Sequence, residues 1–579
     1  MRGVVLVYRD GGRRVDCARE LARLRSGAAA TPASADARLA LLIEVAEFEA
    51  GVADALAPEA DSVEPVCEVL REITVHAAHA WLDALEGERA DRTAAMGTSE
   101  RLALLRELPL PRTIELRVSE GYAYYALYPD TYVASARRFA DATGVRRAHV
   151  IGIRSIGTSL SAVVAAALQR GGCDAATTTV RPRGHPFDRE LRIGGDLAAR
   201  LRRDATLGAH FLIVDEGPGI SGSSFAAVVC WLRAAGVAPE RIVLFPSWDP
   251  DPAALRSRTA QRIWREHSRY CGGSGASSTP TRAFGIDAPS ADFSAGRWRQ
   301  SLAGEPEHWP AAHPQHERWK VFVPSEQRLI RFAGLGHYGT AIETRARTLA
   351  GLGIGAQPGA LRSGFLDLPF VDGSALVRCE SRDDARTIGT YIGRVAAAFP
   401  TGAVVDVEGL NDMIQTNLQG IVTIPRLEAA AEVQVAALDG RMLAHEWIRT
   451  GNGLVKVDAL DHHADHFFPG PQSPAWDLAG AEIELRMDGA QAGEMIGAFA
   501  QVAAGADARR WLPFYRVAYA AFRFGYTTLA ATTLKGTGDE ARFTRAAAYY
   551  SQCALKAAAC LTASAKSPLK QMARSSMKT

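Results

Sequence analysis

The spacing of hydrophobic and polar positions changes several times along the chain, and each change predicts a different kind of structure. Between residues 35 and 85, Ala, Leu and Glu recur at helical spacing, as in LALLIEVAEFEAGVADAL. This spacing predicts a helical N-terminal region over residues 1–110. From residue 113 the pattern TIELRVSEGYAYYALY predicts a strand or a hairpin, followed by a helix over residues 132–142.

Short apolar runs alternate with helical patterns over residues 111–250. The runs AHVIGI, TTTVRP, HFLIVD and RIVLFP predict buried strands, and SLSAVVAAALQRG and SFAAVVCWLRAAG predict helices between them, with a further helix over residues 196–203. Strands that alternate with helices in this way are typical of a parallel sheet covered on both faces. We therefore expect an α/β domain here.

The remaining sequence predicts a connector and a second, α+β domain. Residues 251–318 are rich in Pro, Ser, Gly and Arg, and their tryptophans indicate that this connector docks onto a domain. From residue 319, WKVFV and RLIRFAG predict a β-hairpin, and ETRARTLAGLG predicts the helix that follows it. From residue 476 the pattern is mainly helical, and the aromatic residues in PFYRVAYAAFRFGY have the spacing of a packed helix. The second domain is expected over residues 319–564, with a basic tail at 565–579.

Composition and charge narrow the classes of function. A chain of 579 residues is expected to form two or three domains. Because 66 Lys and Arg nearly balance 64 Asp and Glu, no strong field indicates nucleic acid or a membrane surface as a partner. No apolar run is long enough to span a bilayer, and the N-terminus lacks a signal-peptide pattern. The eight cysteines are scattered without a C-x-x-C motif, so we expect a cytoplasmic protein without disulfides.

The segment HFLIVDEGPGISGSSFAAVV holds the clearest candidate chemistry. An apolar strand ends at two adjacent acids, Asp215 and Glu216, and a loop of small residues then leads into a helix. Backbone N–H groups of residues 221–224, at the positive end of that helix, are expected to bind a phosphate. The paired carboxylates suit the two hydroxyls of a ribose or a magnesium shell.

This segment resembles the PRPP-binding motif of type I phosphoribosyltransferases. Asp215 and Glu216 match its acidic pair, although Glu216 stands where Asp is usual and the loop is one residue longer. The resemblance implies PRPP as substrate and Mg²⁺ as cofactor, with Asp215 as a metal ligand. It also implies that the loop and helix start contact PRPP, through Gly219, Ser221, Gly222, Ser223 and Ser224.

Two further segments occupy the places that the same family requires. VIGIRSIGTSLS would hold pyrophosphate in the loop formed by Arg154, Ser155, Gly157 and Thr158, with Arg154 as the source of charge. TVRPRGHPFDRE occupies the place of the mobile flap or of the segment next to it, and its charged residues are Arg181, Arg183, His185, Asp188 and Arg189.

The resemblance implies one reaction and leaves one alternative. The reaction is transfer of a phosphoribosyl group to an unidentified small-molecule or nucleobase-like acceptor, with release of pyrophosphate. In that reaction Asp215, Glu216 and Arg154 would be the catalytic residues. The alternative is a regulatory protein that binds PRPP or a nucleotide without turnover, because the same fold serves both purposes.

The second domain resembles the aminoglycoside/choline kinase-like family in the order of its elements. Arg331 takes the place of the family's lysine and Glu343 that of the helix acid that pairs with it. Asp439 corresponds to the catalytic aspartate and Asp458 to the metal-binding one, while Asp477 matches a structural aspartate. This resemblance implies ATP as a partner and, as a further alternative for the function, phosphorylation of a small molecule by this domain; the asparagine expected after Asp439 is absent. Arginine also differs from lysine as a phosphate anchor, so a degenerate, pseudokinase-like domain is the alternative.

Residues 458–466 also carry a dense set of metal-binding side chains. Imidazoles together with carboxylates suit zinc or iron, whereas Asp458 alone suits magnesium. No spacing of known geometry appears, and loop histidines that bond to the backbone explain the run equally well. The set is Asp458, Asp461, His462, His463, Asp465 and His466. Nearby, His445 and Glu446 form either an acid–base pair or part of the core.

Overall fold

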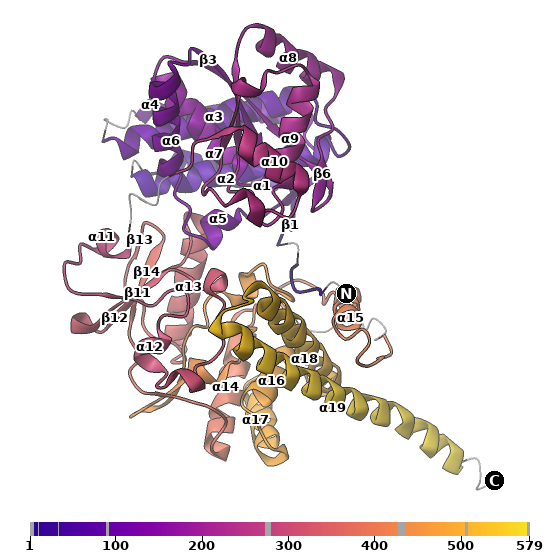
Figure 1. Cartoon of the computed structure of the whole chain (residues 1–579). Helices are drawn as coiled ribbons and strands as arrows, with labels where there is room; N and C mark the ends of the chain where they lie inside the picture. The colour runs from indigo at the N-terminus through magenta and orange to yellow at the C-terminus, as the bar shows by residue number, and fades with distance from the viewer. Residues whose placement is uncertain are drawn as a thin grey trace.

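The computed structural model describes residues 5–9, 11–32, 34–87, 92–272, 279–426, 435–503 and 508–575. These residues form two lobes stacked one above the other (Figure 1). We use "upper lobe" for residues 11–272 and "lower lobe" for residues 279–575. Within the described residues, no helix is both long enough and apolar enough to cross a membrane.

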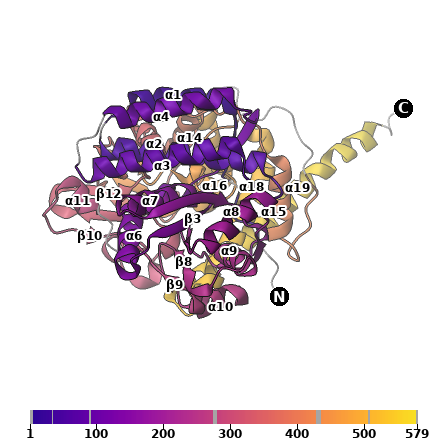
Figure 2. The ribbon, with the colours of Figure 1, turned by 90° about the horizontal axis from the view of Figure 1, so that it is seen from above.

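The predicted N-terminal helices are present and form two layers beside the sheet of the upper lobe. In the view from above, α1 and α4 lie outermost, with α2 and α3 between them and α7 (Figure 2). Their bounds are α1 (Cys17–Ala30), α2 (Ala35–Leu56), α3 (Pro65–Leu85) and α4 (Arg92–Leu104). The buried residues Leu24, Phe48 and Leu70 share a core between these helices.

The strand predicted at residue 113 exists, but the expectation of a hairpin there is wrong. β2 (Thr113–Leu116) pairs in antiparallel fashion with β1 (Arg13–Asp16), about a hundred residues earlier in the chain. The chain then enters two helices, α5 (Glu120–Ala123) and α6 (Asp130–Thr143). Tyr122 is fully buried with its hydroxyl 2.8 Å from Ser159 Oγ, so this aromatic segment packs on a helix and forms no second strand.

The predicted parallel sheet is confirmed. Its strand order is β4-β3-β7-β8-β9, and every neighbouring pair is parallel. Alternate residues of β3 face opposite sides: Val150 packs with α6 and α7, and Ile151 with α8 and α9. The strands are β3 (Arg147–Ile153), β4 (Asp174–Val180), β7 (His210–Val214), β8 (Ile242–Phe245) and β9 (Ser268–Arg269). The helices are α7 (Gly157–Arg170), α8 (Gly195–Thr206), α9 (Ser223–Ala234) and α10 (Arg258–Glu266).

The stretch expected as a connector is divided between the two lobes. Its first part supplies α10 and β9 to the parallel sheet, and Trp264 is fully buried there. Its last part supplies β10 (Ala291–Asp292), which pairs with a strand of the lower lobe. α11 (Pro280–Phe284) lies between β9 and β10 in the chain, and α12 (Arg299–Leu302) follows β10. The prediction that this stretch docks onto folded structure is confirmed.

The lower lobe consists of two small sheets and a group of helices. The predicted hairpin is present as β11 (Lys320–Val323) and β12 (Arg328–Phe332), within an antiparallel sheet of order β10-β11-β12-β14-β13. The other strands are β13 (Leu361–Arg362), β14 (Phe365–Pro369), β15 (Ser374–Ala375), β16 (Trp447–Thr450) and β17 (Gly453–Lys456). The helices are α13 (His337–Gly351), α14 (Arg382–Ala398), α15 (Val407–Asn417), α16 (Ala475–Glu484), α17 (Gly489–Val502), α18 (Ala508–Thr533) and α19 (Gly538–Ser575).

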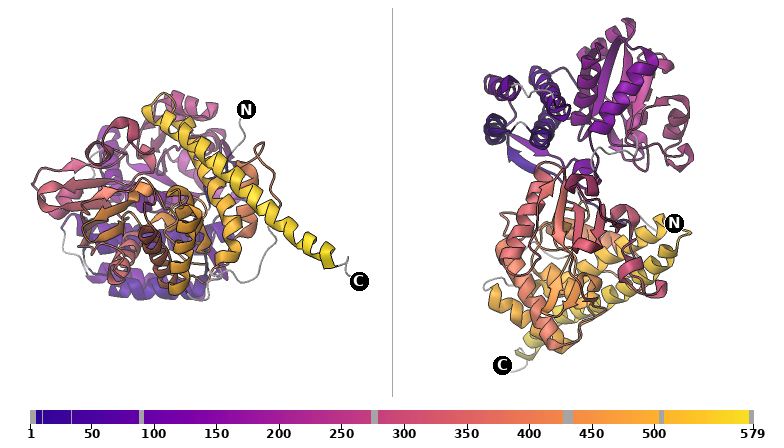
Figure 3. Two further views of the ribbon diagram at one scale, coloured as in Figure 1. Left: turned by 90° about the horizontal axis from the view of Figure 1, so that it is seen from below. Right: turned by 90° about the vertical axis from the view of Figure 1, so that its left-hand side faces the viewer.

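One hydrophobic cluster runs through the junction of the lobes. Tyr132 of the upper lobe and Phe332 and Phe365 of the lower lobe belong to the same buried core. A backbone hydrogen bond from Leu335 N to Tyr122 O, 3.0 Å long, crosses the same boundary. The side view shows the lobes in contact, and the view from below shows the end of α19 extending beyond the lower lobe (Figure 3).

Candidate functional site

The two predicted phosphate loops lie side by side at the carboxyl ends of β3 and β7. These central strands are neighbours, and their connections run to opposite edges of the sheet, to β4 and to β8. Open parallel sheets bind ligands at such a switch point. The loops approach closely, because a Cβ on Gly157 would lie 2.7 Å from Val214 O and 3.4 Å from Asp215 Oδ1. Only glycine fits at position 157.

Asp215 and Glu216 lie at the end of β7 without a cationic partner. Asp215 Oδ1 accepts a 2.8 Å hydrogen bond from Glu216 N, and Glu216 Oε2 accepts one of 3.0 Å from Gly121 N. Burial raises the pKa of Asp215 to about 7; burial, followed by repulsion from Glu120 and Asp215, raises that of Glu216 to about 8. Within the described residues no Lys or Arg forms an ion pair with either carboxylate. The donor set therefore fits Mg²⁺ or sugar hydroxyls.

The phosphate loop is partly closed by its own hydrogen bonds. Gly222, with φ +70, donates from its N–H to Pro218 O at 2.7 Å, and Ser223 N donates to Ser221 Oγ at 3.2 Å. Two of the four predicted amides are therefore used internally. In the part of the chain that the structure describes, the amides of Ser221 and Ser224 have no protein acceptor. They remain available at the start of α9, where the helix dipole attracts an anion.

The predicted flap is a β-hairpin that contacts this loop. β5 (Arg183–His185) and β6 (Asp188–Glu190) pair between β4 and α8, with His185 opposite Asp188. The hairpin turn lies against α9, because Ser223 Oγ donates a 2.6 Å hydrogen bond to Pro186 O. Arg189 remains in the hairpin and donates to Pro182 O at 3.2 Å.

Arg154, expected to bind pyrophosphate, lies in a buried cluster with two acids of the N-terminal region, together with the predicted flap residues Arg181 and Arg183. Arg154 forms ion pairs with Asp61 and with Asp54, the latter at 2.8 Å. Arg181 pairs with Asp54 at 2.5 Å, and Arg183 with Asp61 at 3.1 Å. The expectation that Arg154 offers free charge to a ligand is therefore corrected. Its charge is neutralised because the helical region docks on this edge of the sheet.

The other residues of the β3–α7 loop are held more tightly than their sequence indicated. Ser155 has φ +106, a conformation that is rare and strained for a residue with a side chain. Thr158 is fully buried, its carbonyl accepts two hydrogen bonds from Arg71, and its hydroxyl has no partner among the described residues. Such strain at a loop facing Asp215 is typical of ligand-binding sites.

The predicted kinase-like residues meet in the lower lobe in a different pairing. Arg331 lies on β12 and binds Asp458 Oδ1 at 2.6 Å and Asp461 Oδ2 at 2.9 Å. Glu343 does not reach Arg331; it forms an i, i+4 pair of 2.7 Å with Arg347 on the outer face of α13. The prediction that Glu343 pairs with Arg331 is therefore wrong.

Arg345 occupies the inner face of α13 in place of Glu343. It is 4% exposed and donates to the carbonyls of Ala437, Leu438 and Ala459. A guanidinium with five donors can bind several carbonyls at once, and these bonds hold the two chain segments that carry the acids of this site.

Asp439 is surrounded by donors from three parts of the lower lobe. Its carboxylate lies 3.1 Å from Lys456 Nζ, 3.0 Å from His462 Nδ1 and 2.8 Å from the Tyr391 hydroxyl. Burial opposes ionisation, but Lys456 and His462 hold the pKa of Asp439 down at about 2. Asp477 accepts hydrogen bonds from the N–H groups of Asp439 and Gly440, at 3.1 and 2.9 Å, as a structural aspartate should.

Lys456 is the functional-site residue that the sequence analysis missed. It ends β17, two residues before Asp458, and its ammonium also lies 2.9 Å from Glu446 Oε2. Its side chain has no exposed surface. A lysine two positions from a predicted metal-binding acid was the available signal, because alternate residues of a strand share one face.

The metal-binding run over residues 458–466 does not form one site. Glu446, Asp458 and His462 bring ligand atoms within 4.8 Å of one another, a set that fits a divalent cation. His463 lies apart beside Arg345, and His466 packs on the ring of Phe467. The ammonium of Lys456 and the guanidinium of Arg331 already neutralise Glu446 and Asp458. Within the described residues, the candidate metal ligands are therefore three, whereas the run contains six metal-binding side chains. Two of these three, Glu446 and Asp458, already have a cation of the protein beside them.

His445 does not form an acid–base pair with Glu446. Its ring stacks on that of Trp298, with centroids 5.4 Å apart. Burial, followed by the charge of Lys456, lowers the pKa of His445 to about 3. The neutral ring of His445 packs against the stretch that the sequence predicted as a connector, through its contact with Trp298.

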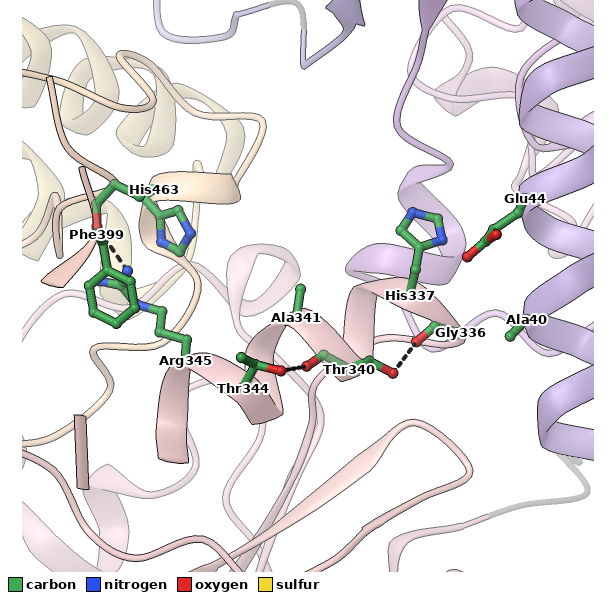
Figure 4. A pocket seen from close by; sticks show the side chains of 11 residues that line it. Ala40, Glu44, Gly336, His337, Thr340, Ala341, Thr344, Arg345, Phe399 and His463 are labelled. Carbon is green, nitrogen blue, oxygen red and sulfur yellow. Dashed lines mark hydrogen bonds between the residues drawn. The ribbon is translucent and has the colours of Figure 1, made fainter. Parts of the chain in front are cut away.

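A cavity of about 580 Å³ lies between the lobes, and Ala437 and His463 in its lining are each two residues in the chain from an acid of the lower lobe. Its walls come from α2, from the first turns of α13, and from Phe399, Ala437 and His463 (Figure 4). Thr340 and Thr344 face it, but their hydroxyls bond back to the carbonyls of Gly336 and Thr340. The cavity offers mostly apolar atoms, with Glu44, His337 and His463 as its other polar side chains besides Arg345.

No protein-family model matches the chain, and no curated protein matches it. Solved structures similar to it include a choline/ethanolamine kinase family protein from Mesorhizobium loti, at 17% identity and TM-score 0.28, over 44% of this chain and 97% of that one. Choline kinase LicA from Streptococcus pneumoniae shares 12% identity at TM-score 0.29, over 41% of this chain and 89% of that one. An ethanolamine kinase from Plasmodium vivax shares 12% at TM-score 0.27, over 40% and 79%. At such TM-scores these similarities do not establish a family, and the proposals below depend on side-chain geometry.

Proposed function

We propose that the upper lobe binds PRPP and transfers its phosphoribosyl group to a nitrogen of a small-molecule acceptor, releasing pyrophosphate. The observation that carries this proposal is the pairing of two unlike features at one switch point. Within the described residues no Lys or Arg forms an ion pair with Asp215 or Glu216, although the charges of Arg181 and Arg189 act on Asp215 from a greater distance, and the open amides of Ser221 and Ser224 follow the two acids in the same loop. A ligand with both hydroxyls and a phosphate satisfies these groups together.

The residues have distinct roles in this reaction. The amides of Ser221 and Ser224 bind the 5-phosphate, and Asp215 and Glu216 accept hydrogen bonds from the ribose hydroxyls. The bond between the anomeric carbon and the pyrophosphate oxygen breaks, with its electron pair leaving on pyrophosphate. The bond from that carbon to the acceptor nitrogen forms, and the nitrogen releases its proton to solvent. Mg²⁺, held by Asp215, would neutralise charge on the departing pyrophosphate.

Two other parts of the upper lobe support the site without touching the reacting atoms. The hairpin whose turn contacts Ser223 excludes water from above the loop. Arg154, through Asp54 and Asp61, positions the strained loop at Ser155. We therefore assign Arg154 a positioning role in place of direct contact with pyrophosphate.

Calorimetry with PRPP and Mg²⁺ tests the proposal. The double variant Asp215→Asn/Glu216→Gln should weaken PRPP binding at least tenfold, because both hydroxyl acceptors lose their charge. The matched control Asp141→Asn/Glu240→Gln removes the same charge from exposed positions of the same lobe and should bind normally. Equal affinity of the double variant and the wild type would exclude this site. Pyrophosphate release with a panel of acceptors then separates an enzyme from a regulator that binds PRPP without turnover.

A second candidate is phosphoryl transfer from ATP in the lower lobe. The convergence of Asp458 with Glu446 and His462 favours it, because these atoms can share a divalent cation. The internal cations Lys456 and Arg331 oppose it, since they already occupy the acids. We infer that the lower lobe is pseudokinase-like. Magnesium-dependent ATP hydrolysis that Asp458→Ala abolishes would reverse this inference.

A further inference from the structure

The short helix α5 is held by both lobes next to Glu216. Its Gly121 N–H donates to Glu216 Oε2 at 3.0 Å, and the carbonyl of Ala123 accepts a 3.0 Å hydrogen bond from Arg318 of the lower lobe. The hydroxyl of the next residue, Tyr124, donates to Ala464 O at 2.6 Å. Figure 1 shows α5 at the junction of the lobes. The residues that flank these anchors, Glu120 and Tyr125, therefore have fixed positions.

Two tyrosine rings remain exposed at this junction. Tyr125 is 44% exposed and Tyr8 is 45% exposed, although most large aromatic side chains of the molecule are buried. Both rings contact the ring of His466, at centroid distances of 6.1 and 5.3 Å. The backbone around Tyr8 is tied to the lower lobe by Arg9 N to His466 O, 3.0 Å long. Three segments that are far apart in the chain thus bring the aromatic rings of Tyr8, Tyr125 and His466 together at the junction of the lobes.

Carboxylates act on both exposed rings, whereas the cations at this junction, Arg9 and Arg318, act on the neighbouring Tyr124. Glu120 precedes the residue that binds Glu216, and its side chain is exposed. Partial burial, followed by the carboxylates of Glu120 and Glu216, raises the pKa of Tyr125. A ligand here meets aromatic faces and hydrogen-bond acceptors, and an anion is repelled.

We propose that this junction is the acceptor site: a flat, nitrogen-containing ring, neutral or cationic, stacks on Tyr8 and Tyr125 and donates an N–H hydrogen bond to Glu120. The inference rests on the proposed function, because Glu216 places the rings beside the ribose phosphate. It adds that the acceptor site is composite and that the lower lobe, through His466, and the N-terminal segment, through Tyr8, complete it. Stacking on tyrosine selects flat rings, and the carboxylates select donors over acceptors.

Ligand-observed NMR and calorimetry on the full chain test this site without PRPP. Adenine and benzamidine are flat rings that donate N–H hydrogen bonds, and benzoate is a flat anion of similar size. The first two should bind and benzoate should not. Tyr125→Ala and Tyr8→Ala should each weaken adenine binding about tenfold, the effect of losing one stacking face. Glu120→Gln should weaken benzamidine more than adenine, because only benzamidine carries a full positive charge.

The control and the separate measurement of PRPP affinity make the outcomes distinct. Leu207→Ala removes another exposed apolar side chain, 55% exposed and remote from α5, and should change nothing. Loss of adenine binding in Tyr125→Ala with unchanged PRPP affinity supports the inference. Unchanged adenine binding in both tyrosine variants overturns it, as does equal binding of benzoate or failure of adenine and benzamidine to bind the wild type. Failure of the wild type to bind PRPP overturns the proposed function instead.

Discussion

The Nζ atom of Lys456 lies 3.1 Å from Oδ2 of Asp439, and neither side chain has any exposed surface. The same ammonium lies 2.9 Å from Glu446. A buried carboxylate pair of this kind requires a cation, and here the chain supplies its own. Asp439 and Glu446 therefore share an internal counter-ion.

Removing that ammonium should destabilise the lower lobe strongly. We expect Lys456→Met to lower the free energy of unfolding by about 3–5 kcal/mol, because Asp439 and Glu446 then remain buried without compensation. Denaturant unfolding followed by circular dichroism measures the change. Lys556→Met, at an exposed position of α19, should change stability by less than about 0.5 kcal/mol. If both variants were equally stable, Lys456 would not be the counter-ion that the geometry indicates.

Asp61 should prove essential for docking the N-terminal helices. It is 1% exposed and receives hydrogen bonds from Arg154, Arg183 and the N–H of Arg181. Asp61→Asn should lower the free energy of unfolding by about 3–5 kcal/mol, since the guanidinium groups of Arg154 and Arg183 lose the carboxylate that they share. Thermal unfolding reports the loss. Glu59→Gln, two residues away and exposed, is the matched control and should leave the melting temperature within about 1 °C of the wild type.

PRPP affinity in the presence of Mg²⁺ should depend on pH through the acid pair. Burial raises the pKa of Asp215 to about 7 and that of Glu216 to about 8, so both are largely protonated at pH 6.5 and largely ionised at pH 8.5. Only the ionised forms bind a cation or accept two hydroxyl hydrogen bonds. Calorimetry should show affinity rising about tenfold across this interval. The Asp215→Asn/Glu216→Gln variant should show no such rise, and a wild type with flat affinity would contradict the assignment.

Glu47 should make the contact between the lobes sensitive to pH. Its carboxylate, on α2, accepts a 2.6 Å hydrogen bond from the Tyr338 hydroxyl on α13, and burial raises the pKa of Glu47 to about 7. A raised carboxyl pKa means that the folded state holds the proton longer than the unfolded state. Stability is therefore fully present below about pH 4.5 and falls as the pH rises towards 7, by about 2–3 kcal/mol from this group.

The variant Glu47→Gln isolates this effect. Gln cannot ionise but can still accept the hydrogen bond from Tyr338, so its stability should decline less between pH 5 and 7. Melting temperatures at three pH values for both proteins give the difference, and Glu343→Gln, in the pair with Arg347, is the control. A wild type and Glu47→Gln variant whose melting temperatures change in parallel would show that Glu47 does not titrate in this range.

Local patterns were sufficient to predict much of the upper lobe. Runs such as AHVIGI and HFLIVD are mostly apolar because both faces of their strands are covered, and that is visible without coordinates. The loop after HFLIVD was equally visible, since acids followed by small residues and a helix lie within twenty positions. The pairing of β2 with β1 was not visible, because strand partners are selected by packing over long distances in the chain.

What the sequence by itself determined is therefore the set of elements and the position of Asp215 and Glu216 at the end of a buried strand. The tertiary structure decided which charges meet. Arg154 and Asp61 are 93 residues apart in the chain, and the ring contact of Tyr8 with His466 joins the N-terminal segment to the lower lobe. Residue type predicts that a buried charge needs a partner, but the partner is chosen by which surfaces pack together, and that depends on the whole fold.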